Sequence, residues 1–357
     1  MKWLRLLFGK RNNPTPLDRL GTALGASPHE DRCIGCLLGC AVGDTLGANL
    51  EYQSRAEIQR NYGRVDSFLH SDGRPLGMFT DDTEMTLALA LSLIECSGLD
   101  PRHCAASYAN FFTSEPRRGY GPAVSRILVM LSGGADYRTT GRAVYPEGSF
   151  ANGGAMRIAP VGLAFRHADD AVLREAVRLA LLCTHVHPDA VDGAFIQAKA
   201  VSELARASPS PEWNVTQLLS GLQSKAEREV VRKKLEIVIG ARSAGWTDEQ
   251  VLSAVCTPNE YGAQFQIHAA EAVACALWAF ACCPNDPEGC IIRAVGLGGD
   301  TDTVAAMAGA LAGSFHGSGW LPRRWFDPLE NQPGVGRDYL IGLARRLAKL
   351  DLCSVPG

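Results

Sequence analysis

The sequence predicts an all-α protein that forms one large helical bundle. Apolar residues recur at spacings of three and four along Ala- and Leu-rich segments, and this is the period of an α-helix. Alternating β-branched residues bounded by hairpin turns are almost absent, which argues against a sheet protein and against a Rossmann-type fold. The chain has 357 residues, 46% of them hydrophobic, so it is long enough to bury a substantial core.

The predicted helices follow one another along most of the chain. Many of them look apolar around most of their circumference, which places them in the interior of the bundle. The clearest periodic segments are 35–42, 83–96, 173–184, 193–207, 268–282 and 303–316, and the densely charged stretch 225–236 is predicted to be a surface helix. The breaks are rich in Gly, Pro, Ser or Asn and fall at 63–77, 114–122, 133–154, 208–214, 257–262 and 284–289.

None of these breaks resembles an interdomain linker, so we expect one domain over 31–350. Residues 1–30 are expected to form a flexible extension. Basic residues accumulate there with no acid before Asp18, so a mitochondrial presequence or an amphipathic anchor stays open beside ordinary disorder. No segment has the length of an apolar membrane span. We therefore expect a soluble, intracellular protein, and a monomer.

The net charge and the number and spacing of the cysteines exclude several classes of protein. The 35 basic and 38 acidic residues give a net charge of -3, which disfavours nucleic-acid binding but leaves room for a local phosphate pocket. Twelve cysteines are too few for a disulfide scaffold of this length and indicate reduced thiols. Cys33, Cys36 and Cys40 are close in sequence, but no second Cys or His pair follows at zinc-site spacing. We expect these thiols to pack on a helix face.

A short run of hydroxyl and carboxylate residues that leads into an Ala-rich helix occurs three times, at 43–45, 80–83 and 299–303. Any one run alone is typical of a helix cap. A cap needs one oxygen, however, whereas the second and third runs each supply two aspartates, whose repulsion in an apolar setting is costly without a cation. Oxygen ligands without Cys or His suit Mg²⁺ or Mn²⁺, and the calcium-loop pattern of an EF-hand is missing.

Two glycine-rich stretches, 118–121 and 149–157, lie between these acidic runs. Small residues would let backbone N–H groups approach a pyrophosphate, and Phe150 or Tyr120 is available to stack on a base. Plain tight turns are the alternative. His185 follows a predicted helix, where it either caps the helix end or donates to a phosphate or ribose oxygen. The pattern alone does not decide between these two roles.

Taken together and in order over about 31–325, these motifs resemble the ADP-ribosylglycohydrolase family. The resemblance implies a single orthogonal multi-helix bundle with a two-metal site. It implies that Glu51 acts on the scissile bond, that Asp302 is shared by both metals, and that Asp44 supports the site. The implied metal ligands are Thr80, Asp81, Asp82, Asp300, Asp302 and Thr303. The implied substrate-binding residues are Gly119, Tyr120, Gly121, Ser149, Phe150, Ala151, Asn152, Gly153 and His185.

The activity implied by the resemblance is removal of ADP-ribose from modified protein side chains, with two Mg²⁺ or Mn²⁺ ions as cofactors. Glu51 in the loop after Asp44 resembles the serine-directed branch, so a serine O-linkage is favoured, and cleavage of poly- or O-acetyl-ADP-ribose stays open. The run 184–188 is similar to arginine-directed enzymes, and this linkage is the alternative, as is an inactive ADP-ribose-binding or structural relative. The chain departs from the family pattern in its first thirty residues and at Phe150, where serine-directed enzymes have Tyr.

Overall fold

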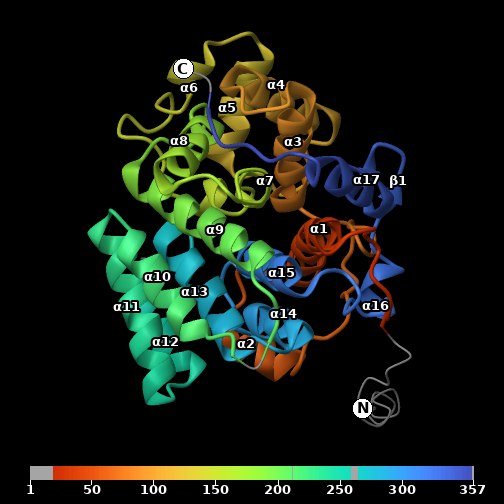
Figure 1. Cartoon of the computed structure of the whole chain (residues 1–357), viewed down its shortest axis with the longest axis vertical. Coiled ribbons are helices and arrows are strands. Elements are labelled where there is room, and N and C mark those ends of the chain that lie inside the picture. The colour runs from red at the N-terminus through yellow and green to blue at the C-terminus, as the bar shows by residue number, and fades with distance from the viewer. Residues whose placement is uncertain (1–18, 211, 259–263, 356–357) are drawn as a thin grey trace.

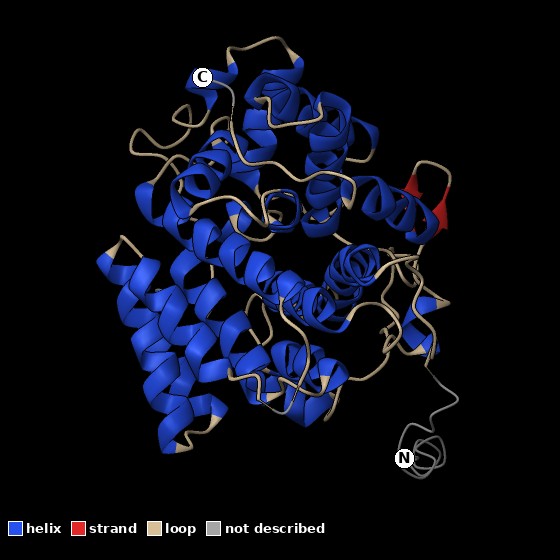
Figure 2. Ribbon diagram, viewed as in Figure 1, coloured by secondary structure: helices blue, strands red, loops and turns tan. Residues whose placement is uncertain are grey.

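The computed structural model describes residues 19–210, 212–258 and 264–355, and the prediction of an all-α fold is confirmed (Figures 1 and 2). Seventeen α-helices lie in this described part of the chain. Its β-structure is one antiparallel pair of two-residue strands, β1 (Asn331–Gln332) and β2 (Val335–Gly336), beside isolated bridges. The buried hydrophobic side chains of the described residues form one continuous core.

The helices vary from a single turn to twenty residues. The first half of the chain contains α1 (Pro28–Gly47), α2 (Arg55–Asn61), α3 (Asp81–Cys96), α4 (Pro101–Ser114), α5 (Pro122–Ser132), α6 (Tyr137–Thr140), the 3₁₀ helix η2 (Asn152–Gly154), α7 (Ala159–Ala164) and α8 (Asp170–Leu181). The second half contains α9 (Pro188–Arg206), α10 (Val215–Lys225), α11 (Glu229–Ala244), α12 (Asp248–Val255), α13 (Ala269–Cys282), α14 (Pro287–Gly296), α15 (Thr301–His316), α16 (Arg323–Phe326) and α17 (Arg337–Leu347).

Helices α1 and α15 lie side by side in the middle of the bundle and touch through their backbones (Figure 1). Glycines occur at every fourth position of α1, so that they share one face of the helix. A Cβ atom added to Gly39 would lie 2.2 Å from the carbonyl oxygen of Gly309, and one added to Gly313 would lie 1.8 Å from that of Gly35. Only glycine permits this approach, which fixes the two helices that carry Asp44 and Asp302.

The surface helix expected over 225–236 is interrupted, because α10 ends and α11 begins within this stretch. The side chain of Asp192 in α9 accepts hydrogen bonds from the backbone N–H groups of Glu227 and Arg228, at 3.2 and 2.8 Å. Arg174 compensates the buried carboxylate at 2.7 Å. A tertiary contact therefore breaks a segment whose charge pattern suggested one continuous helix.

The fold begins before residue 31 and continues beyond residue 350. Leu20 and Gly21 donate backbone hydrogen bonds to Leu321 and Gly319, both at 3.0 Å, so part of the extension expected over 1–30 contacts the rest of the fold. Near the other end, Leu352 donates to the Ala164 carbonyl at 2.8 Å. The rest of the expected extension, 1–18, lies outside the described residues.

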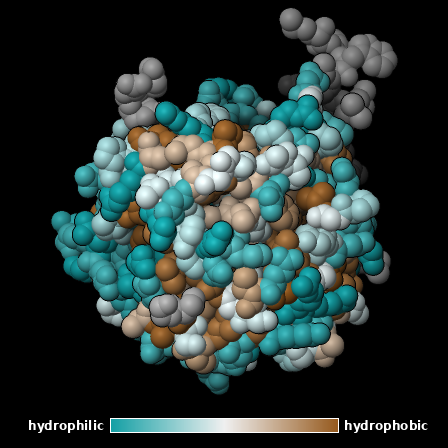
Figure 3. Space-filling model, turned by 90° about the horizontal axis from the view of Figure 1, so that it is seen from above, coloured by the Kyte–Doolittle hydropathy of each residue, from teal (hydrophilic) through white to brown (hydrophobic). Residues whose placement is uncertain are grey.

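Cys33, Cys36 and Cys40 are buried in α1, which confirms that these thiols pack in the core. In the described part of the chain, no helix combines the length and apolarity that a membrane crossing would need. Hydrophilic and hydrophobic residues are interspersed on the face shown in Figure 3.

Candidate active site

Asp44 joins the first acidic run to the second. It lies near the C-terminal end of α1, so the expectation that its run leads into a helix is wrong, whereas the other two runs do begin α3 and α15. The fully buried Asp44 carboxylate accepts from the Thr80 and Thr83 backbone N–H groups at about 3 Å and from the Thr83 hydroxyl at 2.6 Å. Asp44 therefore anchors the start of α3 on α1.

The start of α3 places two carboxylates at the site. Thr80 is the N-cap, and its hydroxyl accepts from the Asp82 backbone N–H and lies 3.2 Å from the Asp82 carboxylate. Asp81 donates its backbone N–H to the Arg118 carbonyl at 3.0 Å. The other carboxylate oxygen of Asp82, Oδ1, is buried and has no hydrogen-bond partner. A buried carboxylate oxygen without a partner is costly, and a bound cation is one group that could compensate it.

The start of α15 supplies the other two aspartates. Gly298 and Gly299 take positive φ angles of 76° and 83°, which lead the chain sharply into the helix. Asp300 is the N-cap, but its side chain does not cap the helix and instead accepts from Asn152 Nδ2 at 2.6 Å. Asp302 accepts from the Thr303 backbone N–H at 3.0 Å. The Asp300 and Asp302 carboxylates are therefore held as acceptors at the site.

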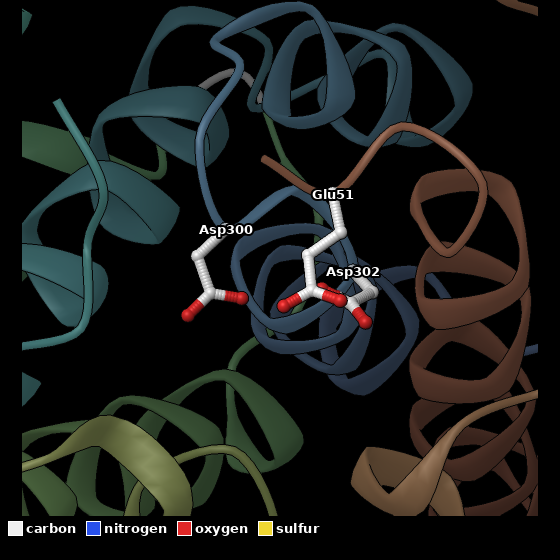
Figure 4. A group of neighbouring side chains, drawn as sticks. All are labelled: Glu51, Asp300 and Asp302. Carbon is white, nitrogen blue, oxygen red and sulfur yellow. The ribbon is translucent and has the colours of Figure 1, made fainter. Parts of the chain in front are cut away.

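Glu51 completes this cluster from the turn that follows α1. One carboxylate oxygen from each of Glu51, Asp300 and Asp302 lies within 4.8 Å of the others. Figure 4 shows the Glu51 and Asp302 carboxylates next to each other, with Asp300 facing the same space from the start of α15. Three carboxylates converging from two segments form a set of hard oxygen donors, which fits a divalent cation.

The carboxyl groups destabilise one another's charged forms. Burial, followed by Coulombic repulsion from Asp300, raises the pKa of Glu51 to about 7. Burial and neighbouring carboxylates raise the pKa values of Asp81, Asp82 and Asp302 well above the ordinary range. A bound cation would reverse these shifts, because it stabilises the ionised carboxylates.

The cluster lies in a cavity of about 450 Å³ that is otherwise mostly apolar. The cavity is lined by Gly119 and Gly121 from one glycine-rich stretch and by 149–152 from the other. Gly119 has a φ of 103°, and a Cβ there would touch the Asp81 carboxylate at 3.4 Å. The structure thus brings both glycine-rich stretches beside the carboxylates, in a cavity large enough for a small organic ligand.

Aromatic and imidazole side chains form another part of this cavity. Phe150 is 48% exposed and stacks on His268, with ring centroids 5.2 Å apart. His185 is buried, and burial together with Arg157 lowers its pKa to about 3, so the ring is neutral. A Cβ on Gly153 would lie 2.9 Å from the His185 ring, which explains the glycine there.

Two of the expected ligand-binding residues, Tyr120 and Gly153, do not line the cavity, and Tyr120 turns away from it. Its ring is buried against Phe112, and its hydroxyl donates to Glu84 at 2.5 Å. It does not line the cavity, although the glycines on either side do. Tyr120 therefore supports the wall of the site, and of the two rings expected to stack on a base only Phe150 is exposed.

Two residues that position the site were not found from the sequence. Gln266 is fully buried, and its side-chain oxygen accepts from the Asp300 backbone N–H at 2.9 Å. Glu330 accepts from the Phe79 backbone N–H at 3.0 Å and pairs with Arg118 at 2.6 Å, so it supports the segment before α3. Both act over long sequence separations and belong to no local motif, so no pattern along the chain could have revealed them.

Comparison with known proteins identifies the family to which this chain belongs. The family model described as ADP-ribosylglycohydrolase matches residues 26–354, which is most of the chain. This chain belongs to the ADP-ribosylglycohydrolase family. Membership of this family makes the protein an enzyme of the glycosyl hydrolase type. The match also begins before residue 31, as the packing of residues 19–30 does.

Individual members of the family align with nearly the whole chain. The ADP-ribosylhydrolase ARH3 of Homo sapiens is 30% identical over 333 residues, which cover 84% of this chain and 90% of that protein. A protein of Archaeoglobus fulgidus is 30% identical over 330 residues, covering 90% and 98%. A solved structure of an ADP-ribosylglycohydrolase-related protein complex has a TM-score of 0.69 and 29% identity, covering 91% of this chain and 99% of that one.

Proposed function

We propose that this enzyme removes ADP-ribose from modified protein side chains in a reaction that depends on two Mg²⁺ or Mn²⁺ ions, with serine O-linkages as the favoured substrate. The observation that carries the proposal is the convergence of carboxylates on one cavity, including the partnerless oxygen of Asp82. The charges of such a cluster need compensation, which divalent cations provide. The full-length similarity to proteins named ADP-ribosylhydrolase supports the substrate class.

The residues proposed to hold the ions come from the starts of two helices. All of them provide oxygen atoms, and no Cys or His belongs to the described carboxylate cluster. Bound divalent cations of this kind polarise substrate oxygens and lower the pKa of an attacking water. The proposed ligands are Thr80, Asp81, Asp82, Asp300, Asp302 and Thr303.

Glu51 is proposed to be the general base for hydrolysis. Burial and Asp300 raise the pKa of Glu51 to about 7, and bound cations would lower this pKa and keep the carboxylate ionised, as a general base requires. Glu51 takes a proton from a water molecule as the water oxygen bonds to ribose C1″. The bond from C1″ to the side-chain oxygen breaks through an oxocarbenium-like state, the departing oxygen takes a proton from solvent, and Glu51 then returns its proton to solvent, so that one water is added overall. The products are ADP-ribose and the unmodified side chain.

The rest of the cavity is proposed to bind the ADP-ribosyl group. The exposed Phe150 ring offers a stacking surface for adenine. The backbone beside Gly119, Gly121 and Ala151 allows close approach of a diphosphate, because little or no side chain intervenes. The neutral His185 lies on the same wall and can donate or accept a hydrogen bond.

The test is to measure ADP-ribose release from serine-linked and arginine-linked peptides side by side, with Mg²⁺, with Mn²⁺ and with EDTA. We expect faster release from the serine-linked peptide and no release in EDTA. Faster release from the arginine-linked peptide would overturn the linkage, and full turnover in EDTA would overturn metal dependence. Binding of ADP-ribose without turnover of either peptide would favour a binding protein.

A further inference from the structure

Tyr52 has an unusual conformation for its position beside Glu51. Its φ angle is 70°, in the left-handed region that non-glycine residues rarely adopt, and its side chain is 74% exposed. Its backbone N–H donates to the Gly299 carbonyl at 2.9 Å, and Gly299 donates back to Gln53 at 2.8 Å. The segment after Glu51 is thus fixed to the loop before Asp300, and the strained conformation holds a large aromatic ring in solvent.

The Tyr52 ring lies flat against a second aromatic ring. Phe265 is parallel to it within 1°, with the ring centroids 4.9 Å apart. Both residues line the cavity that contains the carboxylates. Because the backbone and Phe265 both hold the ring, its outer face is a preformed surface that needs little ordering when a ligand binds. We call this pair the Tyr52–Phe265 platform.

The cavity therefore has a second aromatic surface, since Phe150 also lines it and is backed by His268, on which its ring stacks. An ADP-ribosyl group contains a single base, so adenine can occupy only one of the two surfaces, Phe150 or the Tyr52–Phe265 platform. Tyr52 is the residue next to Glu51, which acts at the scissile bond in the proposed function. The Tyr52–Phe265 platform is thus the pair suited to the protein side of that bond.

The charge of the site indicates what the platform would bind. Glu51 and four aspartates line the cavity, and no Lys or Arg is found among its described lining residues. Two divalent cations would offset four of these five negative charges, and a bound diphosphate would add further negative charge. The loaded site would stay negative, which favours a cationic group on an aromatic face. A guanidinium group fits best, because it is planar and stacks on aromatic rings.

Resting on the proposed function, we infer that the Tyr52–Phe265 platform is an acceptor-side subsite that stacks an arginine side chain next to the modified residue of the substrate protein. The subsite would distinguish modified proteins by their local sequence, beyond the ADP-ribosyl group that they share. A cation on an exposed aromatic ring contributes about 0.5–1 kcal/mol, which corresponds to about a two- to fivefold effect on affinity.

The test compares two serine-linked ADP-ribosyl peptides that differ only at the residue beside the modified serine, which is arginine in one and citrulline in the other. Citrulline keeps the planar shape but has no charge. KM and Kd are measured for wild type, Tyr52→Leu and Tyr52→Phe. Tyr62→Leu is the matched control, because Tyr62 is another exposed tyrosine, 45% accessible, that does not line the cavity.

We expect wild type to bind the arginine peptide about two- to fivefold more tightly than the citrulline peptide. This ratio should fall to about one in Tyr52→Leu and persist in Tyr52→Phe and Tyr62→Leu. An equal affinity of wild type for both peptides, or an unchanged ratio in Tyr52→Leu, would overturn the inference. Because Kd is measured as well as KM, a lack of turnover would reject the proposed function alone, while the Kd ratio still decides on the platform.

Discussion

The middle of the α1–α15 helix pair and its end at the active site are built in opposite ways. In the middle, the Gly39 and Gly309 backbones touch, and neutral packing without side chains brings the helices together. At the end, Asp44, Asp302 and their neighbours crowd buried negative charge, and Asp82 has an oxygen without a partner. The close contact in the middle supplies the rigidity with which the protein holds mutually repelling groups at fixed positions.

Glu51→Gln tests the chemistry of the charged end and should have the largest effect. The amide cannot accept a proton from water, so turnover should fall by about two to four orders of magnitude. Affinity for ADP-ribose should change little, because other residues bind the ligand. Isothermal titration with ADP-ribose beside a peptide-turnover assay measures both. Near-native turnover would remove Glu51 from the mechanism, and lost affinity would make it a binding residue.

Gly39→Ala tests the close backbone contact in the middle of the α1–α15 helix pair. The added Cβ would lie 2.2 Å from the Gly309 carbonyl oxygen, so the helices must separate. The free energy of unfolding should fall by about 3 kcal/mol or more. Gly240→Ala is the control, because Gly240 is exposed in α11 with nothing within 4 Å of the added atom, and it should stabilise by about 0.5–1 kcal/mol. Urea unfolding of both variants checks this, and equal effects would contradict the close helix contact.

His185→Gln tests how the buried groups around the active site make the free energy of unfolding depend on pH. The pKa of His185 is lowered to about 3 in the folded protein, against an ordinary value of 6.5. The folded state thus excludes a proton that the unfolded state binds, and stability is lost as pH falls from about 6.5 toward 3. Between pH 7 and pH 4 the variant should lose about 2–3 kcal/mol less unfolding free energy than wild type. Parallel curves in urea titrations of the metal-free proteins would show that His185 does not carry this effect.

The positions of the helices were predicted well from the sequence, because a helix depends on the local periodicity of apolar residues. The helix expected over 268–282 is α13 to within one residue, and the one expected over 303–316 begins two residues earlier as α15. The interruption between α10 and α11 was missed, because it depends on Asp192, a residue far away in the sequence. The periodicity of apolar residues indicates which face of a helix is buried. It does not indicate where a side chain from a distant part of the sequence interrupts a helix.

The sequence also indicated the residues that gather at the site, but not how they are supported. Paired aspartates at helix starts are visible as excess charge, and the structure places Asp300 and Asp302 beside Glu51. The support from Gln266 and Glu330 and the inward turn of Tyr120 toward Glu84 arise only in three dimensions. These hydrogen bonds span 34, 36 and 251 residues, and separations of this size leave no local spacing to detect.

The most direct test of the proposed two-metal site is a titration of metal-free wild type and Asp302→Ala with Mg²⁺ and with Mn²⁺, followed by calorimetry and peptide turnover. Wild type should bind two ions per chain and gain activity as they bind, because the ions offset the repulsion among the buried carboxylates. Asp302→Ala should lose metal affinity and turnover together. An alanine variant that keeps both ions and full activity would contradict the account.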